Sequence, residues 1–139
     1  MDRFRVLVVD DSSVSVAAIK LAIIGDPMLH FVGAAGTAIE AVSRCQDLDP
    51  DVITLDLDIP GGGGLEALAT IKTTIATPVV IVSTSTYEGS RVIAEVLKLG
   101  ADDVFDKQRV LMDAGTFRLV LRAAAQDSVR PVASAEKRR

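Results

Sequence analysis

The chain has 139 residues, which is the size of one ordinary domain and too short for two. Its 15 basic and 19 acidic residues give a net charge of −4, which excludes the strongly basic class of nucleic-acid-binding proteins. Hydrophobic residues make up 49% of the chain and aromatic residues only 4%, so we expect an aliphatic core of helices packed on a buried sheet.

The cysteine content and the N-terminal segment exclude further classes of protein. Cys45 is the single cysteine, which excludes an internal disulfide and any metal site built from cysteines. The apolar run at residues 6–9 is too short for a signal-peptide core or a membrane span. We therefore expect a cytoplasmic protein that binds neither nucleic acid nor a membrane.

Short apolar runs that do not alternate with polar residues predict strands buried on both faces of a parallel sheet. In chain order they cover residues 4–9, 31–35, 51–55, 79–82 and, with a weaker pattern, 102–106. Each run is followed by a stretch with helical spacing of its apolar residues. The strict alternation predicts right-handed crossovers and helices on both faces of the sheet.

Five helices are predicted from this spacing. The first carries an apolar stripe, Val14, Ala17, Ala18, Leu21 and Ala22, with Ser12 or Ser13 as its N-cap and Gly25 at its end. Thr37 and Glu40 have the spacing of a capping box for the second helix. The other three fall around residues 65–71, 92–97 and 117–124. The prediction is one doubly wound α/β domain over residues 1–125, with residues 126–139 as a linker or flexible tail.

Polar residues gather where the predicted strands end. They are Asp10 and Asp11 after the first strand, Asp56 after the third, Ser83 and Thr84 after the fourth, and Lys107 after the fifth. In a doubly wound sheet, ligands bind at the carboxyl ends of the strands. We therefore predict that these side chains form one site.

The chemistry of that site points to phosphoryl transfer. Asp10, Asp11 and Asp56 repel one another unless a cation lies among them, and hard oxygen ligands in an open site favour Mg²⁺. Lys107 adds a positive charge for a phosphate, and the Ser83 hydroxyl can donate a hydrogen bond to it. These parts predict transfer of a phosphoryl group to Asp56.

Four segments carry a resemblance to a known family. They are VLVVDDS (6–12), DVITLDLDIP (51–60), PVVIVSTSTYEGS (78–90) and LGADDVFDK (99–107). In this order they resemble the receiver domain of response regulators, and most of all the receiver of chemotaxis methylesterase-type regulators. The resemblance spans residues 4 to about 125 and implies a flavodoxin-like sheet with strand order 2-1-3-4-5.

The resemblance also implies a role for each matching residue. Asp56 matches the phosphoacceptor, and Asp10 and Asp11 match the acidic pair that holds Mg²⁺ together with the backbone carbonyl of Asp58. Ser83 matches the switch hydroxyl and is followed by Thr84, while Lys107 matches the phosphate-binding lysine. The side chains of Asp58 and Ser85 match the two positions that tune phosphoryl hydrolysis.

The family likeness implies a signalling switch and not an enzyme. It implies a histidine kinase as phosphodonor and an effector domain or protein that binds the face formed by the fourth helix, the fifth strand and the fifth helix. Three positions depart from the family pattern, and one of them, Thr84, is bulkier than the small residue that usually follows the switch hydroxyl. Val104 replaces the usual switch aromatic, and Gln108 replaces the proline that usually follows the lysine.

Two other functions fit part of the sequence. Asp56-Leu57-Asp58 resembles the DxD motif of haloacid-dehalogenase phosphatases, but that family carries the motif on its first strand. A degenerate receiver that only docks partners is the third reading, and the intact acidic residues argue against it. Glycines 61–64 lack the lysine of a phosphate-binding loop and are read as a connection between strand and helix.

Overall fold

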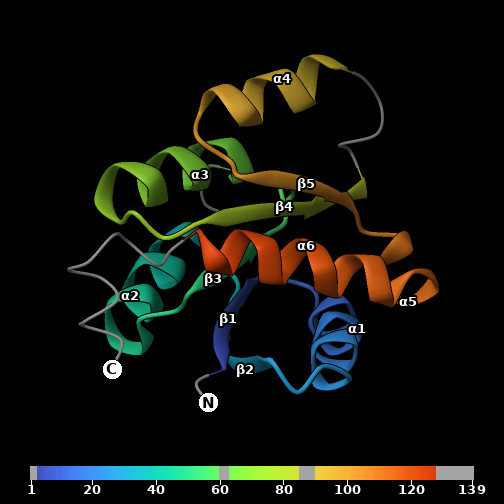
Figure 1. The fold of residues 1–139 in the computed structure, drawn as a ribbon. Helices are drawn as coiled ribbons and strands as arrows, with labels where there is room; N and C mark the ends of the chain where they lie inside the picture. The colour runs from blue at the N-terminus through green and yellow to red at the C-terminus, as the bar shows by residue number, and fades with distance from the viewer. Residues whose placement is uncertain (1–2, 60–62, 85–89, 128–139) are drawn as a thin grey trace.

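The structure is a computed structural model, and it describes residues 3–59, 63–84 and 90–127. Five parallel strands form one sheet in the order β2-β1-β3-β4-β5. Figure 1 shows helices on both sides of this sheet. The predicted fold class and strand order are confirmed.

The elements in chain order are β1 (Phe4–Val9), α1 (Ser13–Ile24), β2 (Leu29–Ala35), α2 (Ala38–Leu48), β3 (Val52–Leu55), α3 (Gly63–Thr74), β4 (Val79–Ser83), α4 (Ser90–Lys98), β5 (Asp103–Asp106), α5 (Arg109–Met112) and α6 (Ala114–Gln126).

The described residues contain six helices, one more than the sequence pattern predicts. The extra helix, α5, has four residues and lies between β5 and the helix that was predicted as the fifth. Its Val110 is buried among the residues packed under α6. A single turn is too short to display a helical period, so the pattern of apolar residues could not reveal it.

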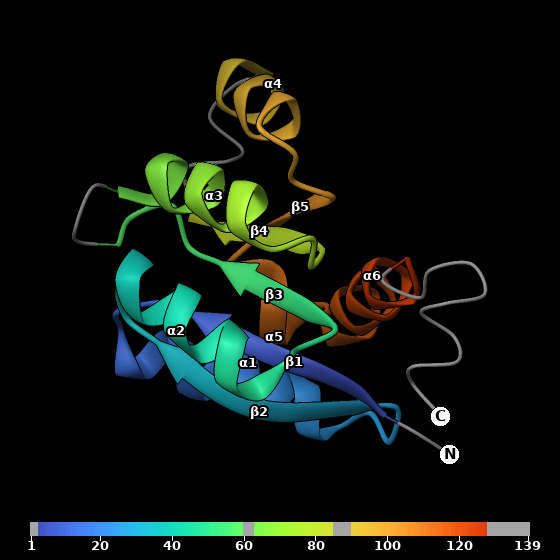
Figure 2. The ribbon, with the colours of Figure 1, turned by 90° about the vertical axis from the view of Figure 1, so that its left-hand side faces the viewer.

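Two apolar layers hold the sheet between helices. One face of the sheet packs against α1, α5 and α6, with Ile19, Phe117 and Leu121 fully or almost fully buried. The other face packs against α2, α3 and α4, with Cys45, Ile71 and Val96 at most 4% exposed. Figure 2 shows α1 and α6 on one side of the sheet and α2 and α3 on the other. Because side chains alternate along each strand, both layers are filled by every central strand.

The predicted apolar stripe of the first helix is buried only in part. Its Val14 and Leu21 side chains are 78% and 62% exposed, whereas Ala22 is buried together with Ile19 and Ile23, which lie outside the stripe. The helix is apolar on more than one side, so the spacing of its apolar residues fits two stripes. Contacts with β2 and α6 select the stripe that is buried, and the sequence pattern alone does not contain those contacts.

The predicted helix caps are confirmed. Ser12 caps α1 and Gly25 ends it. The hydroxyl of Thr37 accepts a hydrogen bond from the Glu40 backbone N–H at 3.1 Å. The Glu40 carboxylate in turn accepts one from the backbone N–H of Gly36, one residue before the cap. Both ends of the β2–α2 connection are thereby fixed beside the end of β1.

Helix α3 begins earlier than the sequence pattern suggests. Gly63 and Gly64 belong to the helix, although they were read as part of a connecting loop, and residues 60–62 lie outside the described residues. A Cβ on Gly64 would stand 2.1 Å from the Leu57 Cα. Glycine is required there because the start of α3 touches the backbone that follows β3. The helix is thereby held close to Asp56 and Asp58.

Candidate functional site

Sheet register places the ends of β1 and β3 side by side, and likewise those of β4 and β5. Val9 pairs with Leu55, and Ser83 pairs with Asp106. The backbone N–H of Asp56 donates to the Val9 carbonyl at 2.9 Å, so the residue after β3 lies beside the residue after β1. The backbone N–H of Lys107 reaches the Ser83 carbonyl at 3.4 Å. The predicted gathering of polar residues at the carboxyl edge is therefore what the sheet produces.

Three carboxylates meet at this edge. One oxygen atom from each of Asp10, Asp11 and Asp56 lies within 4.8 Å of the others. Asp10 and Asp56 are buried, at 4% and 5% exposure, and Asp11 is exposed. Oxygen ligands that keep one side open to water suit a partly hydrated Mg²⁺. The donor set thus fits the cation that the sequence predicts.

Lys107 places a positive charge between two of these carboxylates. Its Nζ atom lies 2.8 Å from Asp10 Oδ2 and 3.0 Å from Asp56 Oδ2. Partial burial lowers the pKa of Lys107, but the hydrogen bonds to Asp10 and Asp56 outweigh this effect and raise the pKa above its ordinary value. The lysine is therefore a permanent cation at neutral pH and offsets part of the carboxylate repulsion.

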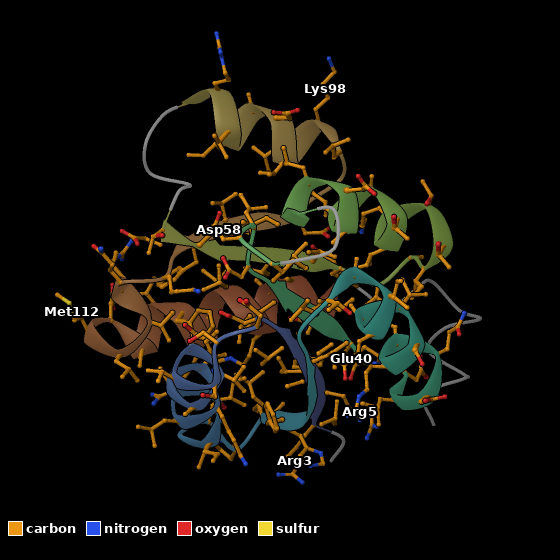
Figure 3. The ribbon with its side chains drawn as sticks, turned by 180° about the vertical axis from the view of Figure 1, so that it is seen from behind. Arg3, Arg5, Glu40, Asp58, Lys98 and Met112 are labelled. Carbon is orange, nitrogen blue, oxygen red and sulfur yellow. The ribbon has the colours of Figure 1, made fainter. Side chains whose placement is uncertain are left out.

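The remaining predicted site residues lie around this cluster at different depths. The backbone N–H of Asp58 donates to Asp56 Oδ1 at 3.2 Å, while the Asp58 side chain is exposed. In Figure 3, Asp58 follows β3 on the same side of the molecule as Met112 of α5. Ser83 is fully buried at the end of β4 and Thr84 is exposed. Ser85 lies outside the described residues.

The sequence analysis missed one polar contact in the site. The hydroxyl of Ser15, in the first turn of α1, accepts a hydrogen bond from Lys107 Nζ at 3.3 Å. Ser15 is one of several residues in the first turn of α1, and only the packing of this helix against other elements decides which of them faces Lys107. Asp10, which ends the strand before this turn, pairs with the same lysine.

A groove of about 670 Å³ lies between α1 and β2, and Asp10, Asp11 and Lys20 are among the residues that line it. The Nζ atom of Lys20 lies 5.0 Å from the centre of the Phe31 ring, which also lines the groove. Away from it, burial raises the pKa of the Cys45 thiol to about 11, so that sulfur stays protonated.

The structure shows the surroundings of two positions that depart from the family pattern. Val104 is half-buried against the α2–α3 layer of the core. The peptide bond before Gln108 is trans, as are all those of the described residues. Within the described ranges, no helix combines the length and the apolar character needed to cross a membrane.

The chain is similar to proteins of one named class. The family model described as "Response regulator receiver domain" matches residues 6–114. A "Protein-glutamate methylesterase/protein-glutamine glutaminase 1" of Rhizobium johnstonii is 41% identical over 103 residues, covering 74% of this chain and 30% of that protein. A Thermotoga maritima protein with the same enzyme name is 37% identical over 131 residues, covering 94% of this chain and 37% of that protein.

Solved structures show the same similarity to receiver domains. The response regulator domain of Thermotoga maritima CheB has a TM-score of 0.81 and 34% sequence identity. The match covers 89% of this chain and 97% of that one. The receiver domain of NarL from Mycobacterium tuberculosis, with a TM-score of 0.80 and 21% identity, supports the fold alone.

The prediction that the protein is not an enzyme is contradicted by these relatives, because they bear the names of enzymes, methylesterases and glutaminases. The chain spans about a third of the length of the curated relatives it matches. The haloacid-dehalogenase reading finds no support in these comparisons. The chain belongs to the response regulator receiver domain family, and within it to the type found in chemotaxis methylesterases.

Proposed function

We propose that Asp56 accepts a phosphoryl group from a histidine kinase, with Mg²⁺ held by Asp10, Asp11, Asp56 and the backbone carbonyl of Asp58. The observation that carries this proposal is the position of the Asp56 carboxylate. It lies within 4.8 Å of two other carboxylates and 3.0 Å from the Lys107 ammonium. A carboxylate beside a lysine ammonium, with further carboxylates that can hold Mg²⁺, suits transfer of an anionic group.

In the proposed step, a carboxylate oxygen of Asp56 forms a bond to phosphorus. The bond between phosphorus and the imidazole nitrogen of the kinase breaks, and its electron pair stays on that nitrogen. Bound Mg²⁺ supplies positive charge for the phosphoryl oxygens. The Asp56 backbone is fixed by its hydrogen bond to Val9 and by the short strand β3, so the nucleophile is held in place before the donor arrives.

Lys107, Ser83 and Thr84 complete the proposed phosphate site. The Lys107 ammonium already lies at Asp56, so it can bind a phosphoryl oxygen with little movement. Ser83 ends β4 and Thr84 follows it, and their hydroxyls are the proposed switch groups that respond to the phosphate. The Asp58 side chain and Ser85 are proposed to tune hydrolysis, because Asp58 is exposed beside Asp56 and can affect the approach of water.

The proposed output is control of an effector of the protein-glutamate methylesterase/glutaminase class, the activity for which the relatives are named. The face formed by α4, β5 and α6 is the proposed contact surface. Leu97 on α4 is 48% exposed there, and Val96 is the one buried residue among the described side chains of that helix. Residues 126–139 are the proposed linker. We also propose that the protein acts in the cytoplasm, where ATP is available to the kinase.

Intact-mass measurement tests the phosphoacceptor. The chain is incubated with a small acyl phosphate and Mg²⁺, beside the Asp56→Asn variant and a sample containing a chelator. We expect one phosphoryl group on the original chain, none on Asp56→Asn and none with the chelator. Uptake of phosphate by Asp56→Asn equal to that of the original chain would overturn the assignment.

A further inference from the structure

The ammonium of Lys107 contacts three oxygen atoms. It donates hydrogen bonds to Asp56 Oδ2 at 3.0 Å and to the uncharged hydroxyl of Ser15 at 3.3 Å, and it forms an ion pair with Asp10 Oδ2 at 2.8 Å. Ser15 is the partner that the phosphoryl chemistry proposed above does not use.

Ser15 is held in place by the first turn of α1. Its backbone N–H donates to the hydroxyl of the cap residue Ser12 at 3.2 Å, and the Ser12 backbone N–H donates to Asp10 Oδ1 at 2.9 Å. The contacts therefore close a ring that runs from Asp10 through Ser12 and Ser15 to Lys107 and back to Asp10. The hydrogen bond to Ser12 fixes the backbone of Ser15, and its short side chain has little conformational freedom to lose when the hydroxyl binds the ammonium.

Charge distinguishes Ser15 from the other two partners. Asp10 and Asp56 belong to the proposed Mg²⁺ site, and both a metal cation and an ammonium compete for the electron pairs of their oxygen atoms. Ser15 contributes a neutral hydroxyl and is not one of the three clustered carboxylates. It can therefore hold Lys107 when the carboxylates are shared with the metal or, in the case of Asp56, carry the phosphoryl group.

We propose that Ser15 is a positioning residue that acts through Lys107. Its Oγ atom anchors the ammonium at the phosphoryl site while Asp10 and Asp56 serve the metal and the phosphoryl group. This inference rests on the function proposed above. It predicts that loss of the hydroxyl lowers the rate of phosphorylation without weakening Mg²⁺ binding.

The kinetic test uses Ser15→Ala, Ser15→Thr and the control Ser13→Ala. Ser13 lies in the same turn, is exposed and has no hydrogen bond of its side chain among the contacts of the described residues. With a small acyl phosphate as donor, we expect Ser15→Ala to lower the maximal rate about threefold to tenfold, the fold-change that corresponds to one hydrogen bond. The Mg²⁺ concentration for half-maximal rate stays within about twofold. Ser15→Thr keeps the hydroxyl and restores the rate to within about twofold.

A second readout is independent of phosphorylation. The ¹³Cε signal of Lys107 is followed by NMR in the metal-free protein, and Mg²⁺ is then titrated while backbone amide shifts report its affinity. We expect Ser15→Ala, and not Ser13→Ala, to shift the Lys107 signal, with the Mg²⁺ affinity within about twofold of that of the original chain. Circular dichroism checks that the variants are folded.

The two experiments separate the possible failures. If the original chain takes up no phosphate, the proposed function fails, and the NMR signal still decides whether Ser15 holds Lys107. If the original chain is phosphorylated and Ser15→Ala reacts at the same rate, the positioning role is overturned. A failure of Ser15→Thr to recover, or an equal loss in Ser13→Ala, would also overturn it, because the effect would then belong to the helix and not to the hydroxyl.

Discussion

Lys107 and Asp10 form an ion pair of 2.8 Å in which the carboxylate side chain is 1% exposed and the lysine side chain 21% exposed. The pair connects the end of β5 to the end of β1, two strands that are not neighbours in the sheet. Asp56, after β3, shares the same ammonium. A single cation thus joins two buried carboxylates that would otherwise repel each other.

Removing that cation is expected to destabilise the metal-free protein. Fully exposed ion pairs contribute about 0–1 kcal/mol, and breaking a buried pair costs about 3–5 kcal/mol. Lys107 lies between these limits, so we expect Lys107→Met to lower the free energy of unfolding by about 1–3 kcal/mol. Urea unfolding without Mg²⁺ measures the loss, and added Mg²⁺ is expected to recover part of it. A variant as stable as the original chain would show that the pair is not stabilising.

The same ion pair gives a pH dependence with a defined sign. The pKa of Lys107 is raised in the folded state, so the unfolded chain loses this proton first as pH rises. The stabilisation is fully present below the ordinary lysine value of 10.5 and is lost as pH rises through the raised pKa. We expect the difference in stability between the original chain and Lys107→Met to be constant from neutral pH to about 10 and to shrink above it. A difference that grows above that pH would contradict this sign.

The strand ends explain how much of the site could be predicted from sequence. A strand's buried run of apolar residues is visible in the sequence, and the residue after it falls at the carboxyl edge, so Asp10, Asp56 and Lys107 could be placed together. Ser15 could not, because the choice of which side of α1 faces the sheet depends on packing against other elements. The exposure of Val14 and Leu21 shows that spacing alone does not select the buried side. Helix α5 was missed because four residues show no period.

Metal binding is expected to depend on Asp11. Its carboxylate is the exposed member of the acidic trio, so Asp11→Ala removes a metal ligand while leaving the buried packing intact. We expect both Mg²⁺ affinity and phosphorylation to fall at least tenfold, on the order of the loss seen when a metal site is disturbed. A Mg²⁺ titration followed by amide shifts measures the first effect. An unchanged response to Mg²⁺ would place the metal elsewhere, and Asp47→Ala, an exposed carboxylate on α2, is the matched control.

Close contact at the start of α3 is expected to exclude any side chain at Gly64. An alanine Cβ there would lie 2.1 Å from the Leu57 Cα, which is backbone that cannot move aside cheaply. We expect Gly64→Ala to lower the free energy of unfolding by about 2 kcal/mol, within the range of about 1–3 kcal/mol for overpacking. Gly115→Ala is the control, because nothing lies within 4 Å of its Cβ. In helix α6 that change is expected to stabilise by about 0.5–1 kcal/mol. Equal effects of the two changes would contradict the argument.

Activation is expected to concentrate near α4. Val104 has one stiff side-chain rotamer and is too short to swing between buried and exposed positions, so the proposed switch needs another moving element. Helix α4 has one buried residue, Val96, among its described side chains, and little packing resists its movement. We expect beryllofluoride with Mg²⁺ to change the amide shifts of residues 84–89, most of which lie outside the described residues, and of the start of α4. Changes confined to α1 and α2 would show that the signal leaves by another face.

Chemical trapping of the phosphorylated residue tests the central claim most directly. Borohydride adds hydride to the acyl carbon of an aspartyl phosphate, phosphate leaves, and further reduction yields homoserine. Peptide mapping of the trapped protein by mass spectrometry then identifies the residue that carried the phosphoryl group. We predict homoserine at position 56 and aspartate at positions 10, 11 and 58. Homoserine at one of those three positions, or at none of the four in a protein whose mass shows bound phosphate, would contradict Asp56 as the phosphoacceptor.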